Sequence, residues 1–321
     1  MMENEAGQGA VRFGRREFLL MTAAVLAGCD RSGAPASAPA ATGVITVVAT
    51  VGMVADLAKR IGGDAVAVET LMGPGVDPHL YKVTADDLVR LQRAELVLYS
   101  GLHLEGKMQD VLASLGGTVK RAHAVTDTVP REKLLRPEGF EGQFDPHVWF
   151  DVESWSFCAR SIVTILSNLR PSEKAAFEQR GAAVQKSLRE LHEWVKTKVA
   201  EIPEARRILV TSHDAFNYFG RTYGFRVIAL QGISTVTEAG LADMAKLVDY
   251  IRDQHVRSIF VESSVPHTTI ERISRDAGVT VGGELFSDAM GVLGRRERDY
   301  DLGTYDGMIR HNVHTIIEAL R

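Results

Sequence analysis

The stretch 172-SEKAAFEQRGAAVQKSLRELHEWVKTKVAEI-202 is a conspicuous helical pattern near the middle of the 321-residue chain. It lies between Pro171 and Pro203 and is rich in Ala, Glu, Lys, Gln, Arg and Leu, which all favour helices. As a single helix it would be about 45 Å long, at about 1.5 Å per residue. A projecting coiled-coil arm is the alternative, but no sustained heptad with flanking charges supports it. The pattern therefore predicts a spine helix that joins two lobes.

Strand-like and helix-like segments alternate on both sides of this helix. The strand-like segments are 44-VITVVATV-51, 66-VAVETLM-72, 95-ELVLYS-100, 207-RILVTS-212, 225-FRVIAL-230, 258-SIFVES-263 and 279-VTVGGEL-285. Segments between them, such as 53–63, 84–94 and 241–254, have helical spacing. This alternation predicts an α/β fold of two (β/α) lobes with mostly parallel sheets. We place the N-terminal lobe at 44–170, the linking helix at 171–203 and the C-terminal lobe at 204–321.

Composition and charge exclude some classes of partner. The chain is 45% hydrophobic, which is enough to bury a core, and its length favours more than one domain. The formal net charge is −4 and no basic run is interleaved with aromatic residues, so nucleic acid is not expected as a partner. No apolar run in the body of the chain reaches membrane-spanning length.

The N-terminus predicts export. Arg15 and Arg16 precede 18-FLLMTAAVLA-27, which is too short to span a bilayer and has the length of a signal-peptide core. The run ends in 26-LAGC-29, which resembles the lipobox of bacterial lipoproteins, so we expect a signal peptide over 1–28 and acyl chains on Cys29. A polar tether to residue 43 follows. A buried N-terminal helix is the alternative.

The expected location is the outer face of the cytoplasmic membrane, in the periplasm or at the cell surface. The stretch 15-RREFLL-20 also resembles a twin-arginine signal, although Gly14 and Leu20 depart from the usual pattern. The export route, general secretory or twin-arginine, stays open. With Cys29 lipidated, Cys158 is the other cysteine, and its place in the helix-like 153–169 predicts a small core residue.

The tripeptide Asp-Pro-His occurs twice, in 76-VDPHLYKV-83 and 144-FDPHVWFDV-152. His79 and His147 thereby stand in turn-rich loops, where the neighbouring Pro limits the backbone. A single His after Pro is more often a core or surface residue than a ligand. Two further candidates, His213 and Asp288, follow predicted strands, and ligands of open α/β sheets bind beyond the carboxyl ends of strands.

The chemistry of these four side chains suits a divalent transition metal. Imidazole suits zinc, copper, iron and nickel, carboxylate suits manganese and other hard ions, and no thiolate is present. Asp77 and Asp145 are expected to accept hydrogen bonds from local backbone groups or from the second ring nitrogen of a ligand. Glu262 is another candidate for this supporting role, with an ordinary strand-end carboxylate as the alternative.

Longer stretches of the sequence resemble a known family. They are 76-VDPHLYKVTADD-87, 101-GLHLEGKM-108, 145-DPHVWFDV-152, 211-TSHDAFNYFGRTYG-224, 232-GISTVTEA-239, 260-FVESSVP-266, 283-GELFSDAMG-291 and 304-TYDGMIRHNVHTIIEAL-320. Together they resemble the manganese- and zinc-binding lipoproteins that feed ABC importers, of the periplasmic solute-binding protein family 9 type. The resemblance covers essentially the whole chain after the tether.

This resemblance implies two lobes joined by one long helix, with the metal site between the lobes. It implies His79, His147, His213 and Asp288 as the metal ligands, Mn²⁺ or Zn²⁺ as the transported ion, and an ABC permease with its ATPase as the partner. A monomer is expected. The segment before His147 has one His, whereas zinc-scavenging relatives have a His-rich loop there, and this difference weakens a zinc-scavenger interpretation. Position 213 is His, where some relatives have Glu, and an imidazole there is compatible with zinc. The physiological metal stays open.

Other interpretations remain beside this one. An adhesin-type lipoprotein with a structural metal is one, and a metallohydrolase is a less favoured one because no His-Glu-x-x-His motif is present. The expected function is therefore not enzymatic. His103 is expected to shape its loop, and His311 and His314 to be solvated or to cap the terminal helix. The other imidazoles have no partner spacing: His123, His192, His255 and His267.

Overall fold

The computed structural model describes residues 43–119, 121–137, 140 and 142–321. The predicted signal peptide, Cys29 and all of the tether before Gly43 lie outside these residues. The described residues from 43 onward form one compact unit. No helix in the described part of the chain combines the length and the apolar character that a membrane span requires.

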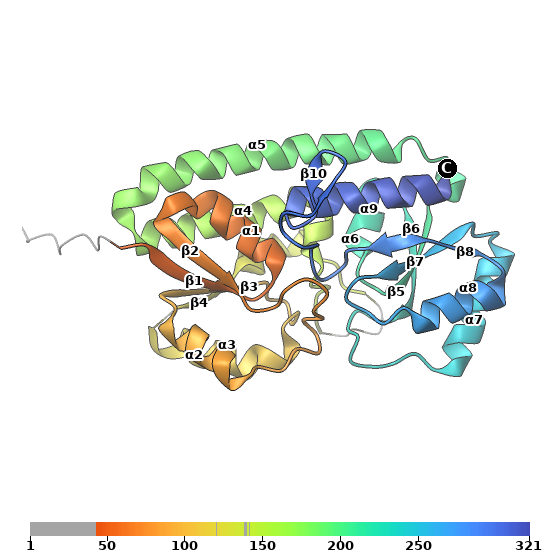
Figure 1. Cartoon of the computed structure of the whole chain (residues 1–321), viewed down its shortest axis with the longest axis horizontal. Helices are drawn as coiled ribbons and strands as arrows, with labels where there is room; N and C mark the ends of the chain where they lie inside the picture. The colour runs from red at the N-terminus through yellow and green to blue at the C-terminus, as the bar shows by residue number, and fades with distance from the viewer. Residues whose placement is uncertain (1–42, 120, 138–139, 141) are drawn as a thin grey trace, which may run out of the picture. The chain divides into compact units, whose positions relative to one another are not determined.

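The N-terminal lobe is built on a four-stranded parallel sheet in the order β2-β1-β3-β4 (Figure 1). Its strands are β1 Ile45–Ala49, β2 Val66–Thr70, β3 Leu96–Tyr99 and β4 Ala122–Ala124. Its helices are α1 Gly52–Gly62, α2 Ala85–Arg93, α3 Gln109–Val119 and α4 Val152–Leu169. Alternating strands and helices bring the carboxyl ends of these strands to one edge of the sheet.

The C-terminal lobe also contains parallel strand pairs, β5 with β6 and β7 with β8, and β5 lies beside β7. The strands are β5 Ile208–His213, β6 Arg226–Gln231, β7 Ser258–Glu262 and β8 Thr280–Leu285. The helices are α6 Asn217–Tyr223, α7 Leu241–Asp253, α8 Thr268–Ala277 and α9 Tyr305–Leu320. A two-residue antiparallel pair, β9 Arg296–Glu297 and β10 Tyr300–Asp301, was not predicted from the sequence.

The predicted spine is helix α5, Lys174–Val199, which is 26 residues or about 39 Å long. It begins later than predicted because Pro171–Glu173 forms a separate 3₁₀ turn. It packs against α1 and α4 on one side of the molecule and against α6 and α9 on the other (Figure 1). Helices α4 and α5 approach closely at Gly181, where a Cβ atom would lie 2.4 Å from a methyl group of Val163.

The larger hydrophobic cluster runs from the N-terminal sheet through α4 and α5 to α9, and it includes Cys158, which is fully buried as predicted. A smaller cluster fills the C-terminal lobe between its strands, α7 and α8. The structure confirms the predicted fold class, an α/β fold with parallel sheets and one long helix. The lobe boundaries at 44–170, 171–203 and 204–321 stay a prediction.

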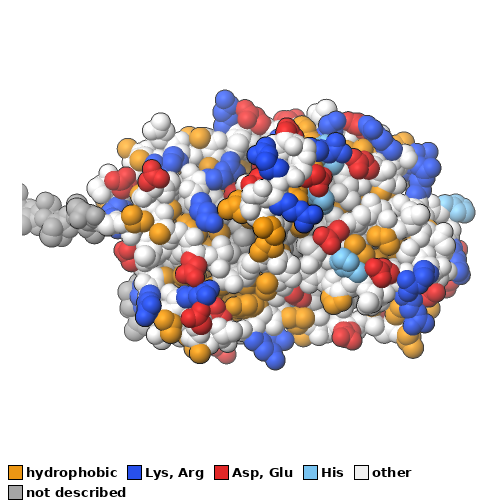
Figure 2. Space-filling model, in the orientation of Figure 1, with side chains coloured by type: hydrophobic (Ala, Val, Ile, Leu, Met, Phe, Trp, Pro, Cys, Tyr) orange, Lys and Arg blue, Asp and Glu red, His pale blue; other side chains and the backbone are white. Residues whose placement is uncertain are grey.

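The surface carries charges of both signs. On the described part of the face in Figure 2, Lys and Arg side chains are interspersed with Asp and Glu, and they form no continuous basic field there. This mixture accords with the formal net charge of −4. Such a face has no long-range attraction for polyanions.

Candidate metal centre

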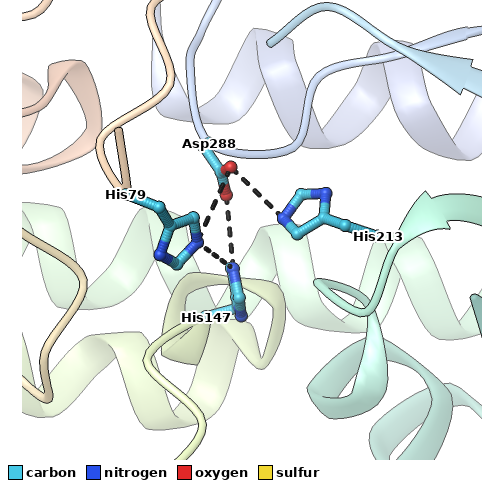
Figure 3. A group of neighbouring side chains, drawn as sticks. All are labelled: His79, His147, His213 and Asp288. Carbon is cyan, nitrogen blue, oxygen red and sulfur yellow. Dashed lines mark hydrogen bonds and ion pairs between the residues drawn. The ribbon is translucent and has the colours of Figure 1, made fainter. Parts of the chain in front are cut away.

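The four candidate ligands come from four different segments (Figure 3). His79 lies in the loop between β2 and α2, and His147 directly precedes the 3₁₀ turn Val148–Phe150. His213 is the last residue of β5, one residue beyond the predicted strand 207–212, and α6 begins only at Asn217. Asp288 follows β8. Two imidazoles, of His79 and His147, therefore come from before the long helix in the sequence, and one imidazole and one carboxylate, of His213 and Asp288, come from after it.

The side chains converge on one point, as their atoms in Figure 3 show. The ligand atoms of all four lie within 4.8 Å of one another. Nε2 of His79 is 3.4 Å from Nε2 of His147. Oδ1 of Asp288 is 3.3 Å from Nε2 of His147, and its Oδ2 is 3.2 Å from Nε2 of His213 and 4.0 Å from Nε2 of His79.

These distances fit a four-coordinate metal ion. Bonds of about 2.0–2.2 Å to nitrogen and oxygen in a tetrahedron place the ligand atoms about 3.4 Å apart. The four residues are 0–3% exposed, so the donors face one another away from bulk water. Nε2 of His213 and Oδ1 of Asp288 are buried, and within the described structure neither has a hydrogen-bond partner of good geometry. A cation between these atoms would satisfy buried polar groups that otherwise face only one another.

His147 is oriented by Asp145, as the sequence predicted. Oδ1 of Asp145 accepts a hydrogen bond from the backbone N–H of His147 at 2.9 Å and lies 2.7 Å from its Nδ1. Asp145 is itself held in place, because Tyr218 donates its hydroxyl to the Asp145 carbonyl at 2.9 Å and Asn217 donates to Oδ2 at 3.3 Å. Nδ1 of His147 is thereby occupied, and Nε2 points to the cluster.

His213 has an equivalent carboxylate in Glu262, at the end of β7. Oε2 of Glu262 lies 2.6 Å from Nδ1 of His213. Its Oε1 accepts from the backbone N–H groups of Ser212 at 2.7 Å and His213 at 2.9 Å. Glu262 therefore lies behind His213 and contacts its second ring nitrogen, which is one of the two roles predicted for it.

His79 is held differently. Asp77 accepts a hydrogen bond from the backbone N–H of His79 through Oδ1 at 2.8 Å, as predicted. Its Oδ2 accepts from the hydroxyl of Thr235, in the C-terminal lobe, at 2.6 Å. Within the described residues, no carboxylate or other polar partner holds Nδ1 of His79.

Burial and neighbouring charge move the pKa values of these imidazoles in opposite directions. Burial lowers the pKa of His79 to about 3, so this ring is neutral at pH 7. Burial alone would also lower the pKa of His147, but the carboxylates of Asp145 and Asp288 outweigh it and raise the pKa to about 9.

The remaining pair behaves as an ion pair in the absence of metal. Burial would lower the pKa of His213, but the charges of Glu262 and Asp288 hold it well above its ordinary value. Burial would raise the pKa of Asp288, but the charge of His213, with that of His147, holds it well below. Asp288 is therefore ionised and ready to ligate, whereas His213 must lose a proton first.

Two other histidines contact side chains outside the cluster. Nδ1 of His311 lies 2.9 Å from Glu297, and Nδ1 of His314 lies 3.1 Å from the Tyr300 hydroxyl. Both rings are partly exposed, as a solvated role requires, but each also contacts a side chain of the β9–β10 hairpin, which was not predicted from the sequence.

Sequence reasoning missed two residues that lie close to the site. Trp149 donates its indole N–H to the carbonyl of Ser287 at 3.0 Å, next to Asp288, and its ring lies 5.3 Å from that of His147. Thr235, described above, is the other. Both lie in stretches that carried the family resemblance, but their partners are more than 130 positions away and no spacing pattern reveals them.

The structure has two (β/α) lobes, a long helix and a buried cluster of three imidazoles and one carboxylate. These features define the class of two-lobed binding proteins whose donor atoms suit a metal ion. The family model described as zinc-uptake complex component A, periplasmic (ZnuA), matches residues 47–319. The chain belongs to this family, which confirms the relationship predicted from the sequence.

Individual relatives match over nearly their whole length. The manganese-binding lipoprotein MntA of Bacillus subtilis (strain 168) is 43% identical over 316 residues, covering 97% of this chain and 100% of that protein. The zinc-binding protein TroA of Treponema pallidum (strain Nichols) is 46% identical over 286 residues, covering 88% and 90%. The solved structure of the periplasmic zinc binding protein TroA from Treponema pallidum has a TM-score of 0.82 and covers 87% of this chain and 99% of that chain.

Proposed function

We propose that this protein captures Mn²⁺ or Zn²⁺ outside the cytoplasm and delivers the ion to an ABC permease that is driven by its ATPase. The observation that carries the proposal is the buried cluster of His79, His147, His213 and Asp288, whose spacing fits a single ion. These four side chains are the proposed ligands. The names of the relatives support both ions, since MntA is described as manganese-binding and TroA as zinc-binding.

The donor set favours transport over catalysis. Four protein ligands nearly saturate a zinc ion, whereas a metallohydrolase keeps one position open for water. We therefore propose that the protein is not an enzyme. The adhesin interpretation, in which the metal serves structure alone, predicts that the ion does not exchange.

The location and assembly state belong to the same proposal. Lipidated Cys29 would anchor a monomer at the outer face of the cytoplasmic membrane, close to the permease. The family description includes the word periplasmic, and the name of MntA includes lipoprotein. Changing Cys29 to Ala should release the protein from the membrane fraction and leave metal affinity unchanged, as fractionation and calorimetry would show.

The ligand set is tested by His147→Ala. Loss of an outer partner typically weakens metal binding about 10–100-fold, so loss of a ligand should weaken it by more than about 100-fold in competition titrations with a chelator. The matched control is His255→Asn, which removes an exposed imidazole at a left-handed backbone position (φ 50°) that Asn tolerates. Equal losses in the two variants would move the site elsewhere.

The cargo is tested by metal analysis of protein recovered from its own compartment. Intrinsic affinities rank Zn²⁺ above Mn²⁺, so tighter zinc binding in vitro is expected and does not identify the cargo. Exchange at equilibrium with a chelator would support transport, and a tightly retained ion would support the adhesin interpretation.

A further inference from the structure

The three imidazoles of the cluster are not equally well supported. A carboxylate oxygen of Asp145 lies 2.7 Å from Nδ1 of His147, and one of Glu262 lies 2.6 Å from Nδ1 of His213. His79 has no such partner among the described residues, and it lies in the loop between β2 and α2, whereas His213 ends strand β5. A ligand without a supporting partner is the one that moves at the lowest free-energy cost.

The segment around His147 is joined to the C-terminal lobe by several buried hydrogen bonds. Trp149 donates to Ser287 at 3.0 Å, and the hydroxyl of Tyr218 donates to Asp145 at 2.9 Å. The Tyr218 hydroxyl also accepts from the backbone N–H of Leu135 at 3.1 Å. Trp149 and Tyr218 are fully buried, so water cannot replace these bonds without a large opening.

In the described structure, one hydrogen bond joins the His79 loop to the C-terminal lobe, apart from contacts among the four proposed ligands. In this bond the Thr235 hydroxyl donates to Oδ2 of Asp77 at 2.6 Å. The other oxygen of the same carboxylate accepts from the backbone N–H of His79 at 2.8 Å. One carboxylate thus connects the backbone of a proposed ligand to the opposite lobe.

The ends of the His79 loop are fixed independently of this bond. The backbone N–H groups of Leu71 and Met72 donate to the carbonyls at the end of β1, those of Ala49 and Thr50, and the Tyr81 hydroxyl donates to Asp87 in α2 at 2.7 Å. The segment around Asp77 can therefore swing out while both ends stay in place. Thr235 is 6% exposed, and the next residue, Val236, is 57% exposed, so the far side of the bond borders solvent.

We propose that Asp77 and Thr235 form a latch that holds His79 against the metal and sets the rate at which the ion leaves. This inference rests on the proposed function. Breaking the bond frees the loop around His79, removes one ligand and opens the cluster on the side that borders solvent. Thr235 is a positioning residue, since it acts on the ion through Asp77 and His79.

The latch is tested first in the metal-free protein by hydrogen exchange. Thr235→Val keeps the shape of the side chain and removes the hydroxyl. Exchange at the His79 amide and in peptides covering residues 76–83 should become about tenfold faster, as loss of one hydrogen bond to a charged group predicts. Thr235→Ser restores a hydroxyl and should return exchange toward the wild-type rate.

The second test measures release of Zn²⁺ into an excess of chelator by stopped flow. Thr235→Val should release the ion about tenfold faster, with a smaller change in the association rate. Thr128→Val is the matched control, because it removes an exposed hydroxyl that donates to the Phe157 carbonyl at 3.2 Å. It should leave the release rate unchanged.

The outcomes separate the latch from the proposed function. Unchanged hydrogen exchange in Thr235→Val, or equal exchange in the Val and Ser variants, would overturn the latch. Wild-type protein that binds no divalent metal would overturn the proposed function. The hydrogen-exchange experiment would still show whether Thr235 holds the His79 loop. Wild-type release rates in Thr235→Val would overturn the proposed role in metal retention.

Discussion

At the scale of single residues, His147 carries a proton at neutral pH in the metal-free protein. Burial opposes this charge, but Asp145 and Asp288 raise the pKa to about 9. A metal ion needs the neutral ring, so binding at pH 7 should release protons, and affinity should keep rising up to about pH 9. An unperturbed imidazole would place this change near pH 6.5.

Calorimetry in buffers with different ionisation enthalpies would count the protons that Zn²⁺ binding releases. We expect at least one proton at pH 7, from His147 or from His213, whose pKa is also raised. Asp145→Asn removes the charge that raises the pKa of His147, so fewer protons should be released. Binding enthalpies that do not depend on the buffer would show that both rings are already neutral.

We predict that loss of the Glu262 charge weakens metal binding almost as much as loss of a ligand. Glu262→Gln keeps the size of the side chain but removes the charge beside Nδ1 of His213, and metal affinity should fall about 10–100-fold. Competition with a chelator measures the loss. The control is Glu284→Gln, which changes an exposed carboxylate 3.4 Å from His267. Equal affinities in the two variants would remove Glu262 from the support of the site.

At the scale of secondary-structure elements, the contact of α4 with α5 depends on Gly181. In an exposed helix Gly→Ala stabilises by about 1 kcal/mol, but here the added Cβ would lie 2.4 Å from Val163 Cγ2. Gly181→Ala should therefore lower the free energy of unfolding, by about 1–3 kcal/mol as for other overpacked contacts. Urea unfolding measures this change.

The double variant Gly181→Ala, Val163→Ala provides the control, because it removes the methyl group that the new Cβ would meet. It should recover part of the lost stability relative to Gly181→Ala alone. A single variant that is more stable than wild type would mean that the helices separate at no cost, and that α5 is not closely packed there.

The strands and helices were largely predictable because each has its own local pattern. The strand-like 207–212 and the helix-like 84–94 appear as Ile208–His213 and Ala85–Arg93, within a residue or so of prediction. The hairpin Arg296–Glu297 and Tyr300–Asp301 was missed because two-residue strands have no periodicity. The convergence of the four proposed ligands followed from strand-end positions plus a family resemblance, whereas Thr235 and Trp149 act through distant partners that no local pattern encodes.

At the scale of the whole molecule, α5 contacts elements of both lobes, and we expect these contacts to restrain the relative motion of the lobes. We expect metal loading to produce modest closure and local ordering of the His79 loop rather than a wide hinge motion. Small-angle scattering should show nearly equal radii of gyration with and without Zn²⁺. A large difference would show that α5 bends or that its contacts with one lobe break.

The larger hydrophobic cluster has a consequence for how the chain folds. It joins side chains as far apart in the sequence as Ile45 and Leu320. Closing contacts over such separations costs chain entropy before burial compensates for it, and proteins dominated by such contacts fold slowly. We therefore expect the N-terminal sheet to acquire its full core only when α9 docks, and the two lobes to gain their native packing in one concerted step rather than as independent folding units.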